Sequence, residues 1–268
     1  NILLMLLLFW RNTPRVEKAV SPILTGIETM SEGREIHLAE QGELSKINAG
    51  LNKAADLLAK KDFARAEWIN GISHDIRTPL SIMLGYAGEL EEDNRLPIDV
   101  RTQAGIIRKQ GERMGKLVAD LNLTSKLEYS MQPINKTLIS PVELVRQVMS
   151  DFINNGLGEE FDMDFQTKKG AEKIIIEGDF DLLARMLENL IHNSIIHNPI
   201  GCAIRISVIE QKNNITLNIE DTGSGIPESL LKRLNSGEVQ SFTWSYSGEH
   251  VHGLGLNLVH QIVKAHKG

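Results

Sequence analysis

Apolar residues recur at helical spacing through the first half of the chain. The spacing predicts a helix over residues 13–30, a polar connector as far as Gly42, and a second helix that begins near Leu44. This second helix starts with a short heptad seam at Leu44, Ile47, Leu51, Ala54 and Leu58. The apolar stripe then changes register and continues to about Leu90. A turn at 91–97 and a further helix over about 100–127 predict an antiparallel hairpin.

The two hairpin helices carry apolar stripes that are wider than one partner helix can cover. Association of two chains into a four-helix bundle would cover both stripes, so the pattern predicts a homodimer. Residues 44–58 add a coiled coil in front of this bundle.

The second half of the chain mixes short strand patterns with helices. Strands are predicted at 137–140, 161–165, 173–177, 203–210 and 215–220. Helices are predicted over 141–152 with Ser140 as cap, after the cap residue Asp179, and from about Leu254 to the end. Strands and helices without strict alternation indicate an α+β sandwich. The predicted fold class is therefore multidomain, with an all-α coiled coil and a dimeric four-helix bundle followed by an α+β sandwich.

His74 lies on the polar face of the long second helix, beside Asp75 and one turn before Thr78. A surface histidine next to a carboxylate is most often only a solvated pair. Pro79, however, removes a helical hydrogen bond just past the histidine and kinks the helix there. An outward His–Asp pair beside a helix breaker favours a reaction with something outside the helix.

Composition narrows the possible partners and compartments. The formal net charge is −6, so the chain has no overall excess of basic residues and a nucleic-acid partner is not expected. The single cysteine, Cys202, excludes an internal disulfide and a cysteine-based metal site, which fits a reducing compartment.

Residues 2–10 form an almost wholly apolar run at the start of the chain. A helix needs about 20 residues to cross a bilayer, so this run is too short to span one alone. Because the chain begins with Asn1, we interpret it as a fragment and the run as the end of a transmembrane helix. Trp10 would then lie at the interface, with Arg11, Arg15 and Lys18 on the cytoplasmic side. The alternative is a buried N-terminal helix.

Three polar features of the second half indicate a nucleotide site. In the first, Asn189, Asn193 and His197 follow one another at intervals of one helical turn. Amide oxygens suit magnesium, a hard cation that shares phosphate oxygens, which makes Asn189 and Asn193 candidate metal ligands. An isolated pair of asparagines would more often be ordinary helix polarity.

The other two features are rich in glycine. Asp221, Gly223 and Gly225 directly follow a strand, where the glycines allow close approach of a flat ligand and Asp221 can accept from the amine of adenine. Gly253 and Gly255 open the last helix, whose amide donors and positive dipole end suit phosphates. The polar stretch 235–252 between them is predicted to be a mobile lid.

These motifs, in this order, resemble those of membrane-bound sensor histidine kinases of two-component systems. Residues 73–80 (SHDIRTPL) resemble the H box, and the three polar features resemble the N box and two glycine boxes of the histidine-kinase and gyrase-type ATP fold. The helix–connector–helix start resembles a HAMP signalling module. The expected domains are the end of a transmembrane helix (1–10), a HAMP-like module (11–60), a HisKA-type dimerisation and phosphotransfer hairpin (61–131) and an incomplete HATPase_c-type ATP-binding domain (132–268).

The resemblance implies a reaction and its residues. His74 would accept the γ-phosphate of ATP, Asp75 would orient and deprotonate it, and Thr78 would orient the water that dephosphorylates a response regulator. ATP and magnesium are the implied cofactors, with a response regulator receiver domain and a second copy of the chain as partners. The expected location is the cell membrane, with the later domains cytoplasmic. Regulator choice would rest on Ile82, Gly85, Tyr86 and Glu89.

The chain departs from the family pattern at several places. Phe242 is the only candidate for the paired phenylalanines of the lid, Val251 and His252 precede the second glycine box, and Ile196 replaces a common basic residue. The chain also ends before the hairpin that normally completes the ATP-binding sheet, which predicts an open sheet edge. Two alternatives stay open: a catalytically weak relay or phosphatase-dominant scaffold, and a gyrase-type ATPase without a phosphohistidine.

Overall fold

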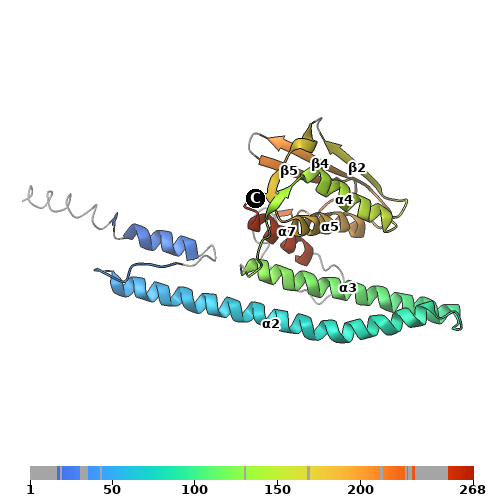
Figure 1. Ribbon diagram of the computed structural model, residues 1–268, viewed down its shortest axis with the longest axis horizontal. Helices are drawn as coiled ribbons and strands as arrows, with labels where there is room; N and C mark the ends of the chain where they lie inside the picture. Colours follow the sequence, from blue (N-terminus) through green and yellow to red (C-terminus); the bar gives the residue numbers. More distant parts are fainter. Residues whose placement is uncertain are drawn as a thin grey trace, which may run out of the picture. The chain divides into compact units, whose positions relative to one another are not determined.

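The computed structural model describes residues 17–18, 20–30, 36–42, 44–129, 131–167, 170–211, 214–226, 228, 231–232 and 253–268. The chain forms two compact units, Asn1–Ile72 and Ser73–Gly268, and helix α2 (Ser45–Glu92) contributes to both (Figure 1). The apolar run at 2–10 and the predicted lid at 235–252 lie outside the described residues.

Among the described residues, no helix combines the length and the apolar character needed to cross a membrane.

The N-terminal unit has the predicted order of helix, connector and helix. Residues 20–30 are helical, 36–42 run without regular structure, and α2 follows. Asn52 of α2 holds the connector through both backbone groups of Leu38, at 2.9 Å each. A Cβ at Gly26 would lie 3.0 Å from Leu38, so the glycine lets the connector approach the first helix closely.

The predicted heptad seam is open on α2. Ile47 is 52% exposed and Leu58 is 47% exposed, while Leu44, Leu51 and Ala54 are half-buried. An apolar seam that a single chain leaves partly exposed suits pairing with a second copy.

Helix α2 continues through Pro79 and ends at Glu92, close to the predicted end. The turn after it is held by Asp93, whose carboxylate accepts from Arg95, and by Leu96 N–H donating to Asp93 O. Helix α3 (Ile98–Glu128) then completes the predicted hairpin. Arg108 of α3 pairs with Glu91 of α2, and this contact lowers the pKa of the Glu91 carboxyl.

Glycine lets the two hairpin helices approach each other. A Cβ at Gly111 of α3 would lie 2.7 Å from Leu84 of α2, too close for a real side chain. Leu80 and Ala87 of α2 are buried on this side, at 4% exposure each. Large apolar residues elsewhere on the hairpin stay at least half exposed: Ile82, Met83, Tyr86, Ile106, Ile107 and Met114. The predicted homodimer would cover part of this open surface.

The domain that follows the hairpin contains two small sheets. Strand β1 (Thr137–Ile139) pairs antiparallel with β3 (Ile176–Gly178). The larger sheet has the order β2 (Asp162–Thr167), β4 (Ala203–Gln211), β5 (Asn214–Asp221), with β2 parallel and β5 antiparallel to β4. Among the described strands, β5 is therefore at an edge of this sheet.

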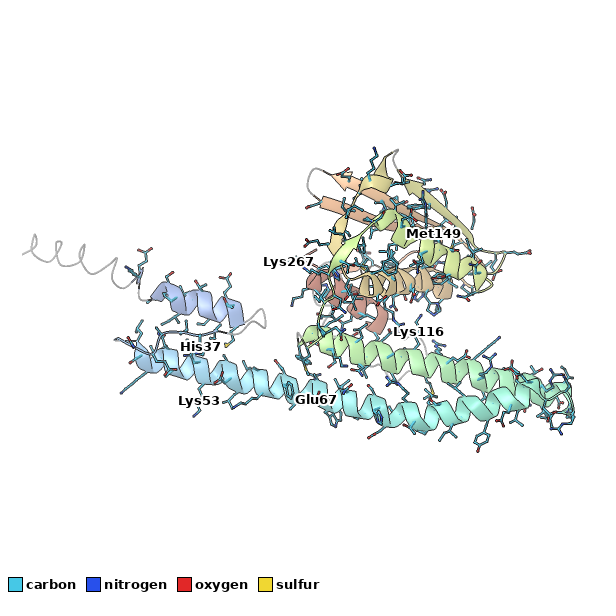
Figure 2. All side chains as sticks on the ribbon, viewed as in Figure 1. His37, Lys53, Glu67, Lys116, Met149 and Lys267 are labelled. Atoms are coloured by element: carbon cyan, nitrogen blue, oxygen red, sulfur yellow. The ribbon has the colours of Figure 1, made fainter. Side chains whose placement is uncertain are left out.

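Three helices cover one face of the larger sheet: α4 (Pro141–Asn154), α5 (Phe180–His197) and α7 (Gly253–Ala265) (Figure 1). The core between the helices and the sheet includes Met149 of α4, labelled in Figure 2. The fully buried side chains of this core come from the three helices and from strand β4, and they include Val142, Leu144, Val145, Leu187, Ile191, Ile204, Ile206, Leu258 and Ile262. Two layers around one core confirm the predicted α+β sandwich.

Both predicted caps are confirmed. The Ser140 hydroxyl accepts from Glu143 N, with Pro141 at the first helical position, and the Asp179 carboxylate accepts from Leu182 N. The strand predicted at 173–177 is wrong at its start, since Ala171–Lys173 form a short 3₁₀ helix and β3 begins at Ile176. Gly170, with φ of 95°, makes the turn before this helix.

A buried ion pair joins hairpin helix α3 to α5. Arg185 donates from Nε and Nη2 to Oδ1 of Asp120, at 3.1 and 2.7 Å. The Asp120 side chain is only 5% exposed and that of Arg185 is 29% exposed. Burial of the His192 side chain on α5 lowers its pKa. The positive charges of Lys116 (Figure 2) and Arg113 on α3 lower this pKa further, and the negative charge of Asp120 opposes them. The two helices thus meet through charged groups.

Removal of Asp120 should destabilise this part of the fold. The Asp120→Ala variant leaves the Arg185 cation partly buried without its carboxylate, so we expect a loss of roughly 3 kcal/mol in the free energy of unfolding, measured by urea titration. The matched control is Arg146→Ala, which breaks the exposed pairs with Glu143 and Glu172 and should cost under about 1 kcal/mol. Equal small losses in both variants would contradict a structural role for the buried pair.

Candidate nucleotide site and phospho-acceptor

The amides predicted to hold a metal lie together at one edge of α5. Asn189 is 5% exposed, and its Nδ2 donates to Arg185 O at 2.9 Å, which fixes the side-chain orientation. A Cβ at Gly255 of α7 would lie 3.3 Å from Asn189 Oδ1 and 3.8 Å from Asn193 Oδ1. The first turn of α7, which begins at Gly253, is therefore close to both amides. Two neighbouring amide oxygens fit a hard cation such as magnesium.

Asp221, at the end of β5, is anchored to α5. Its Oδ2 accepts from the Ser194 hydroxyl at 3.0 Å. Its Oδ1 accepts from Gly223 N at 3.0 Å and lies 3.5 Å from Asn198 Nδ2. These bonds bring the aspartate of the glycine-rich loop against the helix that carries the asparagines, as the order of the motifs predicted.

Asn198, the C-cap of α5, explains why residue 223 is a glycine. A Cβ at Gly223 would overlap the Asn198 amide group. That amide cannot move aside freely, because it donates to Ser194 O at 2.8 Å and accepts from Ser224 N at 3.0 Å. Gly225 is required for a different reason: its φ of 75° is left-handed, and a Cβ there would meet nothing within 4 Å.

Ser194 and Asn198 were missed by sequence reasoning. Both continue the polar edge of α5, Ser194 beside Asn193 and Asn198 one turn later, and this spacing was the only available signal. His197, which was predicted to join the site, is the last residue of α5 and is exposed. The structure thus brings together Asn189, Asn193 and Gly255, and separately Asp221 with its glycine loop and α5.

His74 stands on the solvent-facing side of α2, as predicted. Its side chain is 76% exposed, that of Asp75 is 85% exposed, and His74 Nδ1 lies 3.5 Å from Asp75 Oδ1. Thr78 Oγ1 lies 3.5 Å from His74 O, one turn further along the helix. With a proton on Nδ1 facing the carboxylate, the neutral imidazole keeps the lone pair of Nε2 for reaction.

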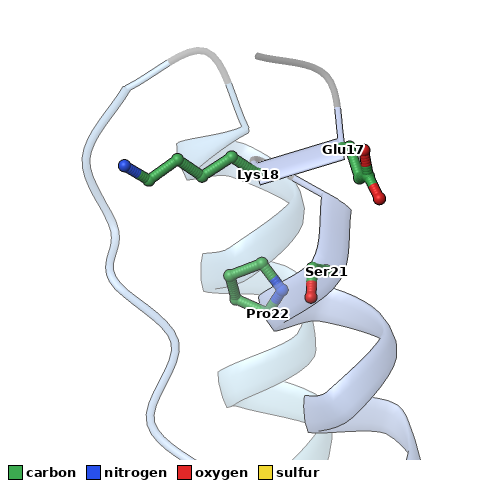
Figure 3. Close-up of a pocket in the computed structure, with 4 residues that line it drawn as sticks. All are labelled: Glu17, Lys18, Ser21 and Pro22. Atoms are coloured by element: carbon green, nitrogen blue, oxygen red, sulfur yellow. The ribbon is translucent and has the colours of Figure 1, made fainter. Parts of the chain in front are cut away.

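Among the described residues, no group of three or more His, Cys, Asp or Glu side chains could hold a metal ion. A pocket in the N-terminal unit is lined by Glu17, Lys18, Ser21 and Pro22, and it contains none of the residues predicted to bind nucleotide (Figure 3).

Two parts of the chain match known domain families. Residues 64–130 match the His Kinase A (phospho-acceptor) domain. Residues 178–268 match the histidine kinase-, DNA gyrase B-, and HSP90-like ATPase family. The chain therefore carries the phospho-acceptor domain and the ATPase domain of a histidine kinase.

Curated relatives have the same character. The chain is 34% identical over 212 residues to sensor histidine kinase YvrG of Bacillus subtilis (strain 168), a match that covers 76% of this chain and 35% of YvrG. It is 28% identical over 236 residues to signal transduction histidine-protein kinase BaeS of Escherichia coli (strain K12), covering 85% of this chain and 48% of BaeS. The chain thus spans less than half the length of either relative.

Solved structures share the fold. Full-length ShkA in complex with AMPPNP has a TM-score of 0.58 at 20% identity, over 74% of this chain and 41% of ShkA. Histidine kinase ThkA in complex with response regulator protein TrrA has a TM-score of 0.52 at 22% identity, over 78% of this chain and 58% of that chain. These matches confirm the fold, a helical hairpin followed by an α/β domain.

Substitution of Gly223 should weaken nucleotide binding. In Gly223→Ala the new methyl group displaces Asn198, which loosens the loop that positions Asp221, so the Kd for ATP should rise about tenfold, equivalent to about 1.4 kcal/mol. Calorimetric titration of the purified protein with ATP measures this. The control is Gly50→Ala, where a Cβ would meet nothing within 4 Å and binding should be unchanged. Wild-type affinity in Gly223→Ala would contradict the proposed role of this loop.

Proposed function

We propose that the protein is a sensor histidine kinase that phosphorylates His74 from ATP and passes the phosphate to an aspartate of a response regulator. The observation that carries the proposal is the presence, in one chain, of an exposed His–Asp pair in the phospho-acceptor domain and a glycine-lined site in the ATPase domain. The similarity of the chain to YvrG and BaeS, which are both described as histidine kinases, also supports the proposal.

Each site residue has a role in the proposed reaction. Asp75 orients the His74 ring and takes its Nδ1 proton as Nε2 attacks the γ-phosphorus of ATP. A phosphorus–nitrogen bond forms, the bond to the bridging oxygen of ADP breaks, and ADP leaves with that electron pair. On the ATPase domain, Asp221 accepts from the amine of adenine, and Gly253 and Gly255 admit the phosphates to the start of α7.

The metal and the remaining contacts belong to α5 and its neighbours. Asn189 and Asn193 would hold magnesium, which offsets phosphate charge when it is bound. His197 and Gly225 complete the proposed binding residues at the margin of the site. The closeness of both amides to Gly255 supports this arrangement.

We further propose that the protein transfers phosphate to a response regulator and also dephosphorylates it. Thr78, exposed one turn beyond His74, would orient the attacking water. Ile82 and Tyr86, at 57% and 65% exposure, would help to select the regulator with Gly85 and Glu89. The solved complex of histidine kinase ThkA with response regulator protein TrrA supports a response regulator as the partner.

The proposed assembly is a homodimer at the cell membrane. The exposed apolar faces of the hairpin support dimerisation, as does the match to a phospho-acceptor domain. Residues 1–10 as the end of a transmembrane helix and 11–60 as a HAMP-like module stay proposals that rest on the sequence and on the helix–connector–helix unit. We also propose the boundaries 61–131 and 132–268 for the remaining two domains.

Replacement of the acceptor should abolish labelling. The His74→Gln variant lacks a nucleophilic ring nitrogen, so radiolabelled ATP should leave no acid-labile phosphate on the protein, while ATP binding is unchanged. The control is His37→Gln, which alters an exposed histidine of the connector and should retain full labelling. Label that survives in His74→Gln would refute the assignment. A wild-type protein that binds no ATP would instead favour the signalling relay.

Replacement of Thr78 should separate the two activities. The Thr78→Ala variant should autophosphorylate normally, because the Thr78 hydroxyl makes only a long contact with His74 O among the described residues. Dephosphorylation of the regulator should slow about tenfold or more, because the attacking water loses the group that orients it. A time course of regulator-bound phosphate measures the rate. Thr102→Ala removes a similar exposed helical threonine of α3 and serves as the control. Equal loss of both activities in Thr78→Ala would contradict the split.

A further inference from the structure

Asp221 is held by donors from two separate parts of the chain. The Ser194 hydroxyl reaches its Oδ2 at 3.0 Å, whereas Gly223 N reaches its Oδ1 at 3.0 Å and Asn198 Nδ2 lies 3.5 Å from the same Oδ1. Ser194 lies in α5 and Asn198 is the C-cap of that helix, and each is 7% exposed. Asp221 itself is exposed, and its bonds to Ser194 and Asn198 are part-buried. Hydrogen bonds to an ionised carboxylate are stronger than bonds between neutral groups.

The Ser194 hydroxyl has two possible acceptors. Its oxygen lies 3.4 Å from Leu190 O, one turn back on α5, and 3.0 Å from Asp221 Oδ2. A hydroxyl donates one hydrogen, and the shorter bond to a charged acceptor is the stronger one. Ser194 therefore donates to Asp221 across 27 residues of sequence.

The orientation of Asn198 is determined by its own neighbours. Its amide nitrogen faces Ser194 O at 2.8 Å, and its amide oxygen faces Ser224 N at 3.0 Å. A flipped amide would set oxygen against a carbonyl and nitrogen against an N–H group. The second hydrogen of Nδ2 is thereby directed to Asp221.

We propose that Ser194 and Asn198 are positioning residues that hold Asp221 for one kind of nucleobase, a purine with a 6-amino group. Oδ1 already accepts two donors, whereas Oδ2 accepts one and keeps a lone-pair direction for the ligand. A carboxylate held in this way accepts a hydrogen bond from a 6-amino group. A 6-oxo group cannot donate to it, because the oxo oxygen and the carboxylate oxygen are both acceptors. Sites with buried polar groups discriminate strongly against ligands that leave those groups unpaired.

The proposal rests on the proposed nucleotide-binding function, and a pair of matched ligands tests it. ATP and inosine triphosphate differ at position 6 of the base, amino against oxo, and at the adjacent N1, which is an acceptor in adenine and carries a hydrogen in hypoxanthine. Calorimetric titration of the whole protein gives both Kd values, and wild type should prefer ATP. In Ser194→Ala the Asp221 carboxylate loses one anchor, so the preference for ATP over inosine triphosphate should fall about tenfold, equivalent to about 1.4 kcal/mol.

The control is Ser125→Ala on α3. Ser125 is also buried, at 3% exposure, and its hydroxyl has no hydrogen-bond partner in the described part of the chain, so its removal should leave the preference intact. A Ser194→Ala protein with the wild-type preference would overturn the proposal. Equal affinity of wild type for the two nucleotides would overturn it as well. Failure of wild type to bind ATP at all would overturn the proposed function itself, and this inference with it.

Discussion

Helix α5 has to satisfy three neighbours at once, and the geometry of the ATPase domain follows from this constraint. Its apolar side, with Leu187 and Ile191 fully buried, packs into the core. Arg185 binds Asp120 of α3, and Ser194 reaches Asp221 at the end of β5. Successive helical residues are about 100° apart, so these directions are rigidly linked. Rotation of α5 by one residue would expose the apolar side and break both polar contacts.

The surroundings of Asp221 and of His74 differ in burial, in keeping with the roles proposed for the two residues. Around Asp221 the polar side chains are buried and bonded to one another, which keeps a binding site in shape before the ligand arrives. Leaving one such buried group without a partner costs about 1–3 kcal/mol, so the network also stabilises the fold. His74 is exposed and makes only a long contact with Asp75. This exposure suits the acceptor role proposed for His74, because such an acceptor would have to meet both ATP and a regulator.

Local sequence signals predicted the elements well. Helix caps at Ser140 and Asp179 depend on residues within one turn, and both have the expected hydrogen bonds. The start of β3 was misplaced, because a run of β-branched residues also fits the extended chain that follows the short 3₁₀ helix. The open faces of the hairpin also follow from its pattern, since a stripe wider than one helix contact leaves apolar residues exposed in a single chain.

The amino-acid sequence by itself determined the periodic faces of the helices, and with them the outward position of His74 and the row of asparagines on α5. It also placed glycine at residue 225, but only the structure shows the positive φ that favours glycine there. Only the tertiary structure decided that Ser194 and Asn198 meet Asp221, and that Gly223 must be small because Asn198 fills the adjacent space. Periodicity records which residues share a face of one element. The atoms that this face meets, more than 20 residues away in the chain, depend on how helix and sheet pack together.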